Sequence, residues 1–197
     1  MLKRAMDILG GGLGLLLLSP LLVLVGLAIL VTMGRPCFFR QQRVGRYGRG
    51  FWLIKFRTMT MSAGAEKGQF DAGRSTRVTP LGRILRKTKV DELPELWNVF
   101  VGDMSLVGPR PEIPKWVAVY PERWGKVLAV RPGITDPASI KFRNEEEILA
   151  QAANPDQAYR EQILPTKLGL YEEYVRTQSF WGDVGLIFKT LWVVVRG

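Results

Sequence analysis

The chain opens with a long run of apolar residues. Residues 8–34 carry no formal charge, and the stretches 15–18 and 21–25 are apolar on every side of a helix. At about 1.5 Å per residue, such a helix exceeds the roughly 20 apolar residues that a bilayer core needs. Ser19-Pro20 lies near the middle of the run. Because proline removes a backbone donor and clashes with the preceding turn, we expect a membrane helix that kinks or breaks there.

Basic residues flank this run on both sides. Lys3 and Arg4 precede it, and five arginines follow it within residues 35–49. Since positive charge favours the cytoplasmic side, both ends are expected there, which predicts a re-entrant helix over residues 1–36 rather than a true span. A cleaved signal peptide is a weaker interpretation, because the run is long and no A-x-A site follows it. A buried core helix stays open, although a helix that is apolar all round favours lipid.

The rest of the chain, residues 37–197, alternates short polar and apolar segments typical of one globular domain. Residues 37–44 and 51–59 are strand-like and are joined by the glycine-rich turn 45–50, which predicts a β-hairpin. Residues 62–79 are polar and glycine-containing, so we expect a mobile loop, with a lid as one interpretation. We expect helices at residues 80–89, 92–100, 112–120, 161–178 and 180–195. The predicted fold class is α/β, mostly α with a small β-hairpin.

The last of these helices suits a membrane surface. Residues 180–195 are rich in Trp, Phe and Val but are too short to span a bilayer. Trp181 and Trp192 are typical of the membrane–water interface, so this helix is predicted to be interfacial or to belong to the core.

The composition of the chain limits the partners that it can bind and the residue types that can act as catalysts. The 197 residues carry a formal net charge of +10, which implies an anionic partner such as nucleic acid, an acidic lipid surface or a phosphorylated substrate. There is no histidine, so histidine triads and histidine metal sites are excluded. A single cysteine, Cys37, excludes a disulfide framework. Catalytic work therefore falls to Asp, Glu, Lys or Tyr.

Adjacent carboxylates, Asp91 and Glu92, stand between basic residues and the start of a helix. Downstream, the stiff turn Gly108-Pro109-Arg110-Pro111 presents one guanidinium. A carboxylate nucleophile, a metal-capable neighbour and fixed cations are the parts that phosphoryl chemistry needs. On residue types alone, the more ordinary explanation of the pair is structural, with Asp91 as a helix N-cap and Glu92 as a first-turn charge.

Further cations are candidates for binding an anionic substrate. Lys55 and Arg57 lie two apart on the returning strand and are expected to share one face. Arg131 is held in the turn at residues 130–135. A guanidinium can hold phosphate oxygens through two parallel hydrogen bonds.

Several motifs, in this order and spacing, resemble the bacterial sugar transferases, the monotopic phosphoglycosyl transferases that prime glycan assembly on polyprenyl phosphate. The motifs are Lys3-Arg4-x-x-Asp7, Ser19-Pro20, Phe39-x-Gln41-x-Arg43-x-Gly45, Lys55-Phe56-Arg57-Thr58-Met59, Asp91-Glu92-Leu93-Pro94, Trp97-Asn98-Val99, Gly102-Asp103-Met104-Ser105-Leu106-Val107-Gly108-Pro109-Arg110-Pro111 and Arg131-Pro132-Gly133-Ile134-Thr135.

This resemblance implies an Mg²⁺-dependent transfer of a phospho-sugar from a UDP-sugar to polyprenyl phosphate, usually undecaprenyl phosphate, with release of UMP. It implies that Asp91 is the nucleophile of a covalent intermediate and that Glu92 helps to hold the metal. Arg86 matches a family arginine that contacts phosphate, and Lys55 and Arg110 lie in family motifs. The implied location is the cytoplasmic face of the bacterial inner membrane, with membrane lipids as partners and no role for nucleic acid.

The chain departs from the family pattern after residue 135. Residues 136–143 replace a segment that many members share, and Arg143 is the candidate for the family's later arginine. The transferred sugar, the pathway and a homodimeric state stay open. A membrane-attached hydrolase of nucleotide sugars and a non-enzymatic basic binding module are the competing functions.

Overall fold

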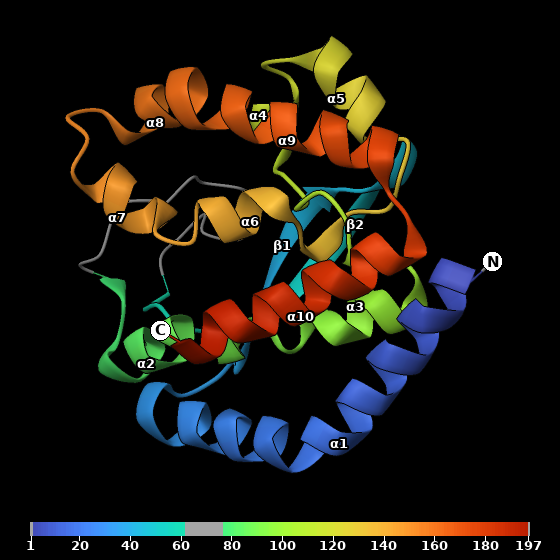
Figure 1. Ribbon diagram of the computed structural model, residues 1–197. Coiled ribbons are helices and arrows are strands. Elements are labelled where there is room, and N and C mark those ends of the chain that lie inside the picture. The colour runs from blue at the N-terminus through green and yellow to red at the C-terminus, as the bar shows by residue number, and fades with distance from the viewer. Residues whose placement is uncertain (1, 62–76, 197) are drawn as a thin grey trace.

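The computed structural model describes residues 2–61 and 77–196, so most of the expected loop at residues 62–79 lies outside the described residues. Short helices dominate, with two small sheets (Figure 1), which confirms the prediction of a mostly helical chain. In chain order the elements are α1 (Leu2–Met33), β1 (Phe38–Val44), η1 (Arg46–Gly48), β2 (Gly50–Phe56), α2 (Pro80–Lys87), η4 (Val90–Glu92), α3 (Glu95–Val101), β3 (Ser105–Val107), α4 (Pro114–Val117), α5 (Pro121–Val127), β4 (Gly133–Thr135), α6 (Pro137–Lys141), α7 (Glu145–Ala150), α8 (Pro155–Ala158), η5 (Tyr159–Ile163), α9 (Leu164–Thr177) and α10 (Phe180–Arg196).

The apolar N-terminal run forms one bent helix. Figure 1 shows α1 running beneath the rest of the chain and changing direction near its middle. The expected kink is present, but the alternative of a break at Ser19-Pro20 is wrong, because the helix continues through Pro20. Pro20 cannot donate to the carbonyl of Leu16, and the Ser19 hydroxyl donates to it instead at 2.8 Å. This substitute hydrogen bond satisfies the freed carbonyl at the bend.

α1 packs on the globular part at both of its ends. In the first half, glycines allow close approach to α3: an added Cβ would lie 3.3 Å from Val99 at Gly11 and 3.1 Å from Leu96 at Gly14. In the second half, Ile29 is fully buried beside Phe56 of β2. The outward side of α1 is apolar and exposed, and by length and composition α1 can cross a membrane.

Polar side chains tie the first turns of α1 to the middle and the end of the chain. Lys3 donates to the carbonyl of Val107 at 2.8 Å and forms an ion pair with the buried Asp183 of α10. Asp7, also buried, accepts hydrogen bonds from the Ser105 hydroxyl at 2.8 Å and the Leu106 amide at 2.9 Å. β3 is therefore held from one side by α1.

Two strand pairs carry the returning chain. β1 and β2 form the expected antiparallel hairpin, with Phe38 opposite Phe56 and Val44 opposite Gly50, although the second strand ends at Phe56 rather than residue 59. β3 and β4 form a short parallel pair that the sequence patterns did not predict. Asn98 of α3 is buried and braces the hairpin, because its amide donates to the carbonyl of Trp52 at 2.8 Å and accepts from the amide of Ile54 at 3.2 Å.

The main core lies between α4, α5 and α9 and is built on aromatic side chains. Trp116 and Tyr159 pack with ring centroids 5.0 Å apart, and Trp124 and Tyr171 pack at 6.1 Å. All four side chains are buried. Burying a large apolar side chain contributes roughly 1.5–3 kcal/mol, so this cluster is a main source of the stability of the globular part.

Gly82 sets the distance between α2 and the end of the hairpin. A Cβ at this position would lie 2.0 Å from the carbonyl oxygen of Thr58, which is backbone and cannot move aside. Gly82→Ala is therefore expected to lower the free energy of unfolding by about 1–3 kcal/mol, as overpacking does. Thermal unfolding followed by tryptophan fluorescence measures it.

Gly125 of α5 is the matched control, because a Cβ there meets nothing within 4 Å. Gly125→Ala should raise stability by about 0.5–1 kcal/mol through helix propensity. Equal unfolding temperatures for the Gly82→Ala and Gly125→Ala proteins would contradict the close approach of α2 to Thr58.

Candidate active site

Asp91 is buried on a tight turn that precedes α3. Lys89 adopts a left-handed conformation (φ 57°), and the 3-10 turn Val90–Glu92 follows it. The N-cap position of α3 is Pro94, with no side-chain cap, so the interpretation of Asp91 as the cap of that helix is wrong. Asp91 is only 7% exposed, and its Oδ1 accepts no hydrogen bond from the residues that the structure describes. A buried acceptor without a partner costs stability and points to a function.

Glu92 faces two cations supplied by distant segments. Lys55 of β2 lies 2.9 Å from its Oε1. Arg110, from the turn after β3, contacts both carboxylate oxygens and lies 3.2 Å from Oε2. The same Lys55 lies 3.2 Å from Glu95, whose side chain is 1% exposed. The structure thus gathers Lys55, Glu92, Glu95 and Arg110 into one buried cluster beside Asp91.

The environment separates the two neighbouring carboxyl groups. Burial raises the pKa of Asp91 above its ordinary value, although the Lys55 charge opposes the shift. Burial also acts on Glu92, but the charges of Arg110 and Lys55 outweigh it and hold the pKa of Glu92 well below its ordinary value. Burial raises the pKa of Glu95, again against the Lys55 charge. Glu92 is therefore the carboxylate that stays ionised, and Asp91 is the more basic of the two. Neighbouring carboxyl groups whose pKa values are pushed apart in this way commonly take different catalytic roles.

Arg86 of α2 lies close enough to the cluster for its charge to lower the pKa of Asp91, as the smallest of the contributions that oppose burial. Its Nε donates to the hydroxyl of Thr58 at 3.0 Å. Its Nη1 lies 3.0 Å from each carboxylate oxygen of Glu146 on α7. The arginine is thus oriented from one side by the hairpin end and paired on the other with a surface carboxylate.

Three other predicted binding residues lie elsewhere. Arg57 does not share a face with Lys55: it is buried and donates to the carbonyls of Met33 at 2.5 Å, Gly34 at 2.7 Å and Arg35 at 3.0 Å. Its role is to satisfy the end of α1, where carbonyls lack helical partners and favour a cation. These contacts with carbonyls give no support to the predicted anion-binding role of Arg57.

Arg131 and Arg143 are likewise not in the cluster. Arg131 donates through Nε to the carbonyl of Gly102 at 2.8 Å and so supports the turn that leads into β3. Arg143 is exposed in the turn between α6 and α7, where none of the described residues forms a hydrogen bond or ion pair with it.

Glu95, Asn98 and Thr58 are parts of the site that the sequence analysis did not single out. Glu95 follows Pro94 directly, and a carboxylate in the first turn of a helix is an ordinary pattern with a dipole explanation. Only its burial, which no local pattern reveals, distinguishes it. Thr58 and Asn98 lie within two of the family motifs of the sequence, but those motifs do not reveal which contacts the two side chains make.

The donor set fits one magnesium ion held mainly by substrate. In the described parts of the chain, no three His, Cys, Asp or Glu side chains are gathered as a ligand set. An ionised carboxylate has about four acceptor positions, and the contacts of Glu92 use three of them, which leaves one on Oε2. Mg²⁺ often takes one or two protein carboxylates and completes its shell with phosphates and water. Glu92 Oε2 meets that requirement, and the unpartnered Oδ1 of Asp91 stays available for other chemistry.

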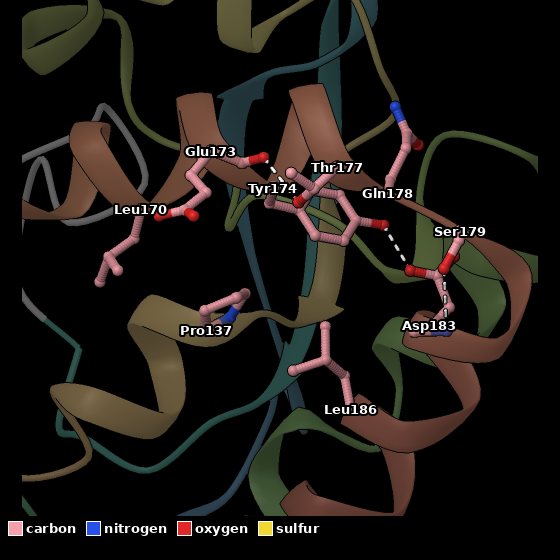
Figure 2. Close-up of a pocket in the computed structure, with 10 residues that line it drawn as sticks. Pro137, Leu170, Glu173, Tyr174, Thr177, Gln178, Ser179, Asp183 and Leu186 are labelled. Atoms are coloured by element: carbon pink, nitrogen blue, oxygen red, sulfur yellow. Dashed lines mark hydrogen bonds between the residues drawn. The ribbon is translucent and has the colours of Figure 1, made fainter.

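A cavity of about 300 Å³ lies away from this site. Pro137, Leu170, Tyr174, Asp183 and Leu186 line it between α6, α9 and α10, and none of the candidate site residues does. Figure 2 shows Tyr174 and Asp183 pointing toward one another at its edge, where the hydroxyl donates to the carboxylate at 2.8 Å. The residues around Asp91 therefore do not belong to this cavity.

A buried carboxylate with an unpartnered oxygen lies here near fixed cations, in a chain that also has a helix long enough to cross a bilayer. This combination suits a protein that acts on phosphorylated compounds at a membrane surface. The comparison with known proteins agrees. The chain belongs to the bacterial sugar transferase family, whose sequence profile matches residues 1–197.

Several relatives of the chain carry names that refer to undecaprenyl phosphate or to polysaccharide production. A UDP-N-acetylgalactosamine-undecaprenyl-phosphate N-acetylgalactosaminephosphotransferase of Aeromonas hydrophila is 33% identical over 201 residues, covering 100% of this chain and 44% of the relative. A UDP-glucose:undecaprenyl-phosphate glucose-1-phosphate transferase of Caulobacter vibrioides is 35% identical over 194 residues, covering 96% and 68%. Exopolysaccharide production protein ExoY of Rhizobium meliloti is 33% identical over 207 residues, covering 97% and 84%. The chain spans less than half the length of several such relatives.

Proposed function

We propose that the protein transfers a sugar phosphate from a UDP-sugar to undecaprenyl phosphate and releases UMP, as the first step of assembling a bacterial polysaccharide or glycoconjugate. The observation that carries this proposal is the buried Asp91 with its unpartnered Oδ1 beside the ionised Glu92. The names of the relatives supply the substrate classes. Lys55, Arg86 and Arg110, which match family positions, supply positive charge near Asp91 for a donor that carries two phosphates.

In this mechanism the Asp91 carboxylate attacks the phosphorus that bears the sugar. The phosphorus–oxygen bond to UMP breaks, UMP leaves with the bonding electrons, and the phospho-sugar stays on Asp91 as an acyl phosphate. A phosphate oxygen of the lipid then attacks the same phosphorus and the bond to Asp91 breaks, which restores the carboxylate. Asp91 needs no general base because it attacks as an anion, in keeping with the absence of histidine from the chain.

The cations lower the charge that otherwise repels an anionic nucleophile. Arg86 lies on the side of Thr58 and is the candidate for a donor phosphate, whereas Lys55 and Arg110 hold Glu92 ionised. Mg²⁺ bound at Glu92 Oε2 would supply charge neutralisation for the two phosphates and the leaving UMP. Arg110, which contacts both oxygens of Glu92, keeps that carboxylate in one orientation.

The test of this function is UMP release from a panel of UDP-sugars in nanodiscs, with and without undecaprenyl phosphate and Mg²⁺. A transferase releases sustained UMP with one donor sugar only when the lipid phosphate is present. Release that ignores the lipid would favour the hydrolase, and no release with any donor would remove the proposal. Nucleic acid is omitted throughout, so turnover in its absence also excludes the binding module.

The same proposal places α1 as a re-entrant helix on the cytoplasmic face of the inner membrane. Its start is held to α3, because Arg4 donates to the carbonyls of Val99 at 2.7 Å and Phe100 at 2.9 Å. Its end is held by Arg57, which donates to the carbonyl of Met33 at 2.5 Å. Because both ends contact one globular body, they favour the same side of a bilayer, with the bend at Pro20 deepest in the lipid.

Cysteine labelling separates a re-entrant helix from a span. Leu2→Cys and Arg40→Cys, each in a Cys37→Ser background, place a thiol at exposed positions near the two ends. A membrane-impermeant maleimide should label both variants in inverted membrane vesicles and neither in intact spheroplasts. Labelling of the two positions from opposite sides would establish a span.

A further inference from the structure

The ion pair between Arg86 and Glu146 occupies a cation that the proposed reaction needs. Arg86 Nη1 lies 3.0 Å from both oxygens of Glu146, and no function assigned so far uses this carboxylate. We propose that Glu146 is a competitor within the chain: it pairs with Arg86 until a phosphate of the nucleotide takes its place, and so sets the affinity for the donor. The inference rests on the proposed function, since it assumes that Arg86 receives a donor phosphate.

The pair is built to be displaced. The side chain of Glu146 is 66% exposed, and that of Arg86 is 26% exposed. Exposed carboxylate–cation pairs are weak because water and salt screen them. A phosphate offers more charge and more acceptor oxygens to the same guanidinium, and such charge-assisted bonds are stronger. A nucleotide phosphate is therefore expected to win this exchange.

Neither partner depends on the pair for its position. Arg86 stays oriented by its Nε hydrogen bond to Thr58 at 3.0 Å. α7 stays attached through Glu145, which lies 2.9 Å from the nearly buried Lys167 of α9. Both contacts remain when Glu146 is neutralised. Removing its charge should therefore release the guanidinium of Arg86 and leave α7 in place.

This arrangement predicts an unusual direction of effect. If the pair is formed most of the time, the binding-competent Arg86 is a minority, and the apparent dissociation constant is raised by that fraction. Glu146→Gln keeps the size of the side chain and removes its charge. It should tighten the binding of UMP about three- to sixfold, the range that an exposed ion pair of ordinary strength allows. Most substitutions near a binding site weaken binding instead.

The experiment measures UMP binding by isothermal titration calorimetry to the full chain in nanodiscs with Mg²⁺. The variants are Glu146→Gln, Glu147→Gln, Arg86→Met and the double variant Arg86→Met/Glu146→Gln. Glu147 is the matched control, because it is an exposed carboxylate in the same turn of α7. Glu147→Gln should leave the affinity within about twofold of the unmodified chain. In the Arg86→Met background, Glu146→Gln should have no effect.

Each outcome decides one question. Tightening in Glu146→Gln that disappears without Arg86 supports the proposal. Unchanged or weaker binding in Glu146→Gln, or equal tightening in Glu147→Gln or without Arg86, overturns it while the proposed function stands. If the unmodified chain does not bind UMP and also releases no UMP from any UDP-sugar of the donor panel, the proposed function fails and the inference fails with it.

Discussion

Asp91→Asn is expected to abolish sustained UMP release, lowering turnover by roughly 10⁴-fold or more, as loss of a covalent nucleophile does. The substitution keeps the shape of the side chain and removes its nucleophilic charge. Mass spectrometry of the unmodified enzyme, denatured after incubation with a UDP-sugar, should find the phospho-sugar on the peptide that contains Asp91. Asp156→Asn, an exposed carboxylate on α8, is the control and should retain activity.

The same variant should be more stable than the unmodified chain. Burial raises the pKa of Asp91, so ionising it in the folded protein costs free energy, and this cost grows as the pH rises through the raised pKa. Asp91→Asn removes the cost at neutral pH, and the unfolding temperature of the variant should rise.

The activity of the unmodified chain should fall on acidification at a pH above the ordinary aspartate value of 3.8. An inactive variant that is also unfolded would leave the nucleophile assignment without support, and residual turnover near the unmodified rate would refute it.

Lys55→Met is expected to lower the free energy of unfolding by about 3–5 kcal/mol, the usual cost of leaving a buried ion without its partner. Lys55 serves two carboxylates, at 2.9 Å from Glu92 and 3.2 Å from Glu95. Glu92 keeps Arg110, but the buried Glu95 loses the cation that faces it. For a chain of this size the unfolding temperature should fall by roughly 6–20 °C.

Thermal unfolding in detergent, followed by tryptophan fluorescence, measures the loss. Lys87→Met removes an exposed lysine of α2 and should change the unfolding temperature little. Lys55→Met/Glu95→Gln should recover part of the stability, because the uncompensated charge is then absent. If Lys55→Met and Lys87→Met unfold alike, the carboxylate cluster is not held together by Lys55.

Local patterns were sufficient for much of the fold. The strand-like runs of the hairpin and the runs that predict helices at residues 80–89 and 180–195 each specify an element through neighbours in sequence, and the structure has all of them as β1, β2, α2 and α10. The parallel pair β3–β4 was not predictable in this way, since each strand has three residues and its partner lies far along the chain. At Ser19-Pro20 the pattern indicated the bend, and only the hydroxyl contact explains why the helix continues.

In the candidate site, too, some features follow from the local sequence and others depend on tertiary packing. Adjacent carboxylates and a proline-stiffened arginine turn are visible in sequence, so Glu92 and Arg110 were candidates before their contact was known. The destinations of Arg57 and Arg131 were not visible, because a guanidinium binds whichever carbonyls the tertiary fold leaves without partners. The burial of Glu95 depends in the same way on the packing of α3 beneath the hairpin.

The attachment of the first turns of α1 bears on attempts to make a water-soluble version by deleting the membrane segment. Without Lys3, the enclosed Asp183 would lose its counter-charge, and without Asp7 the strand leading to Arg110 would lose two anchors. Arg57 would be left without the carbonyls of Met33 and Gly34. The N-terminal helix is thus part of the scaffold of the candidate site, and solubilisation is better sought by replacing its exposed leucines while leaving the helix in place.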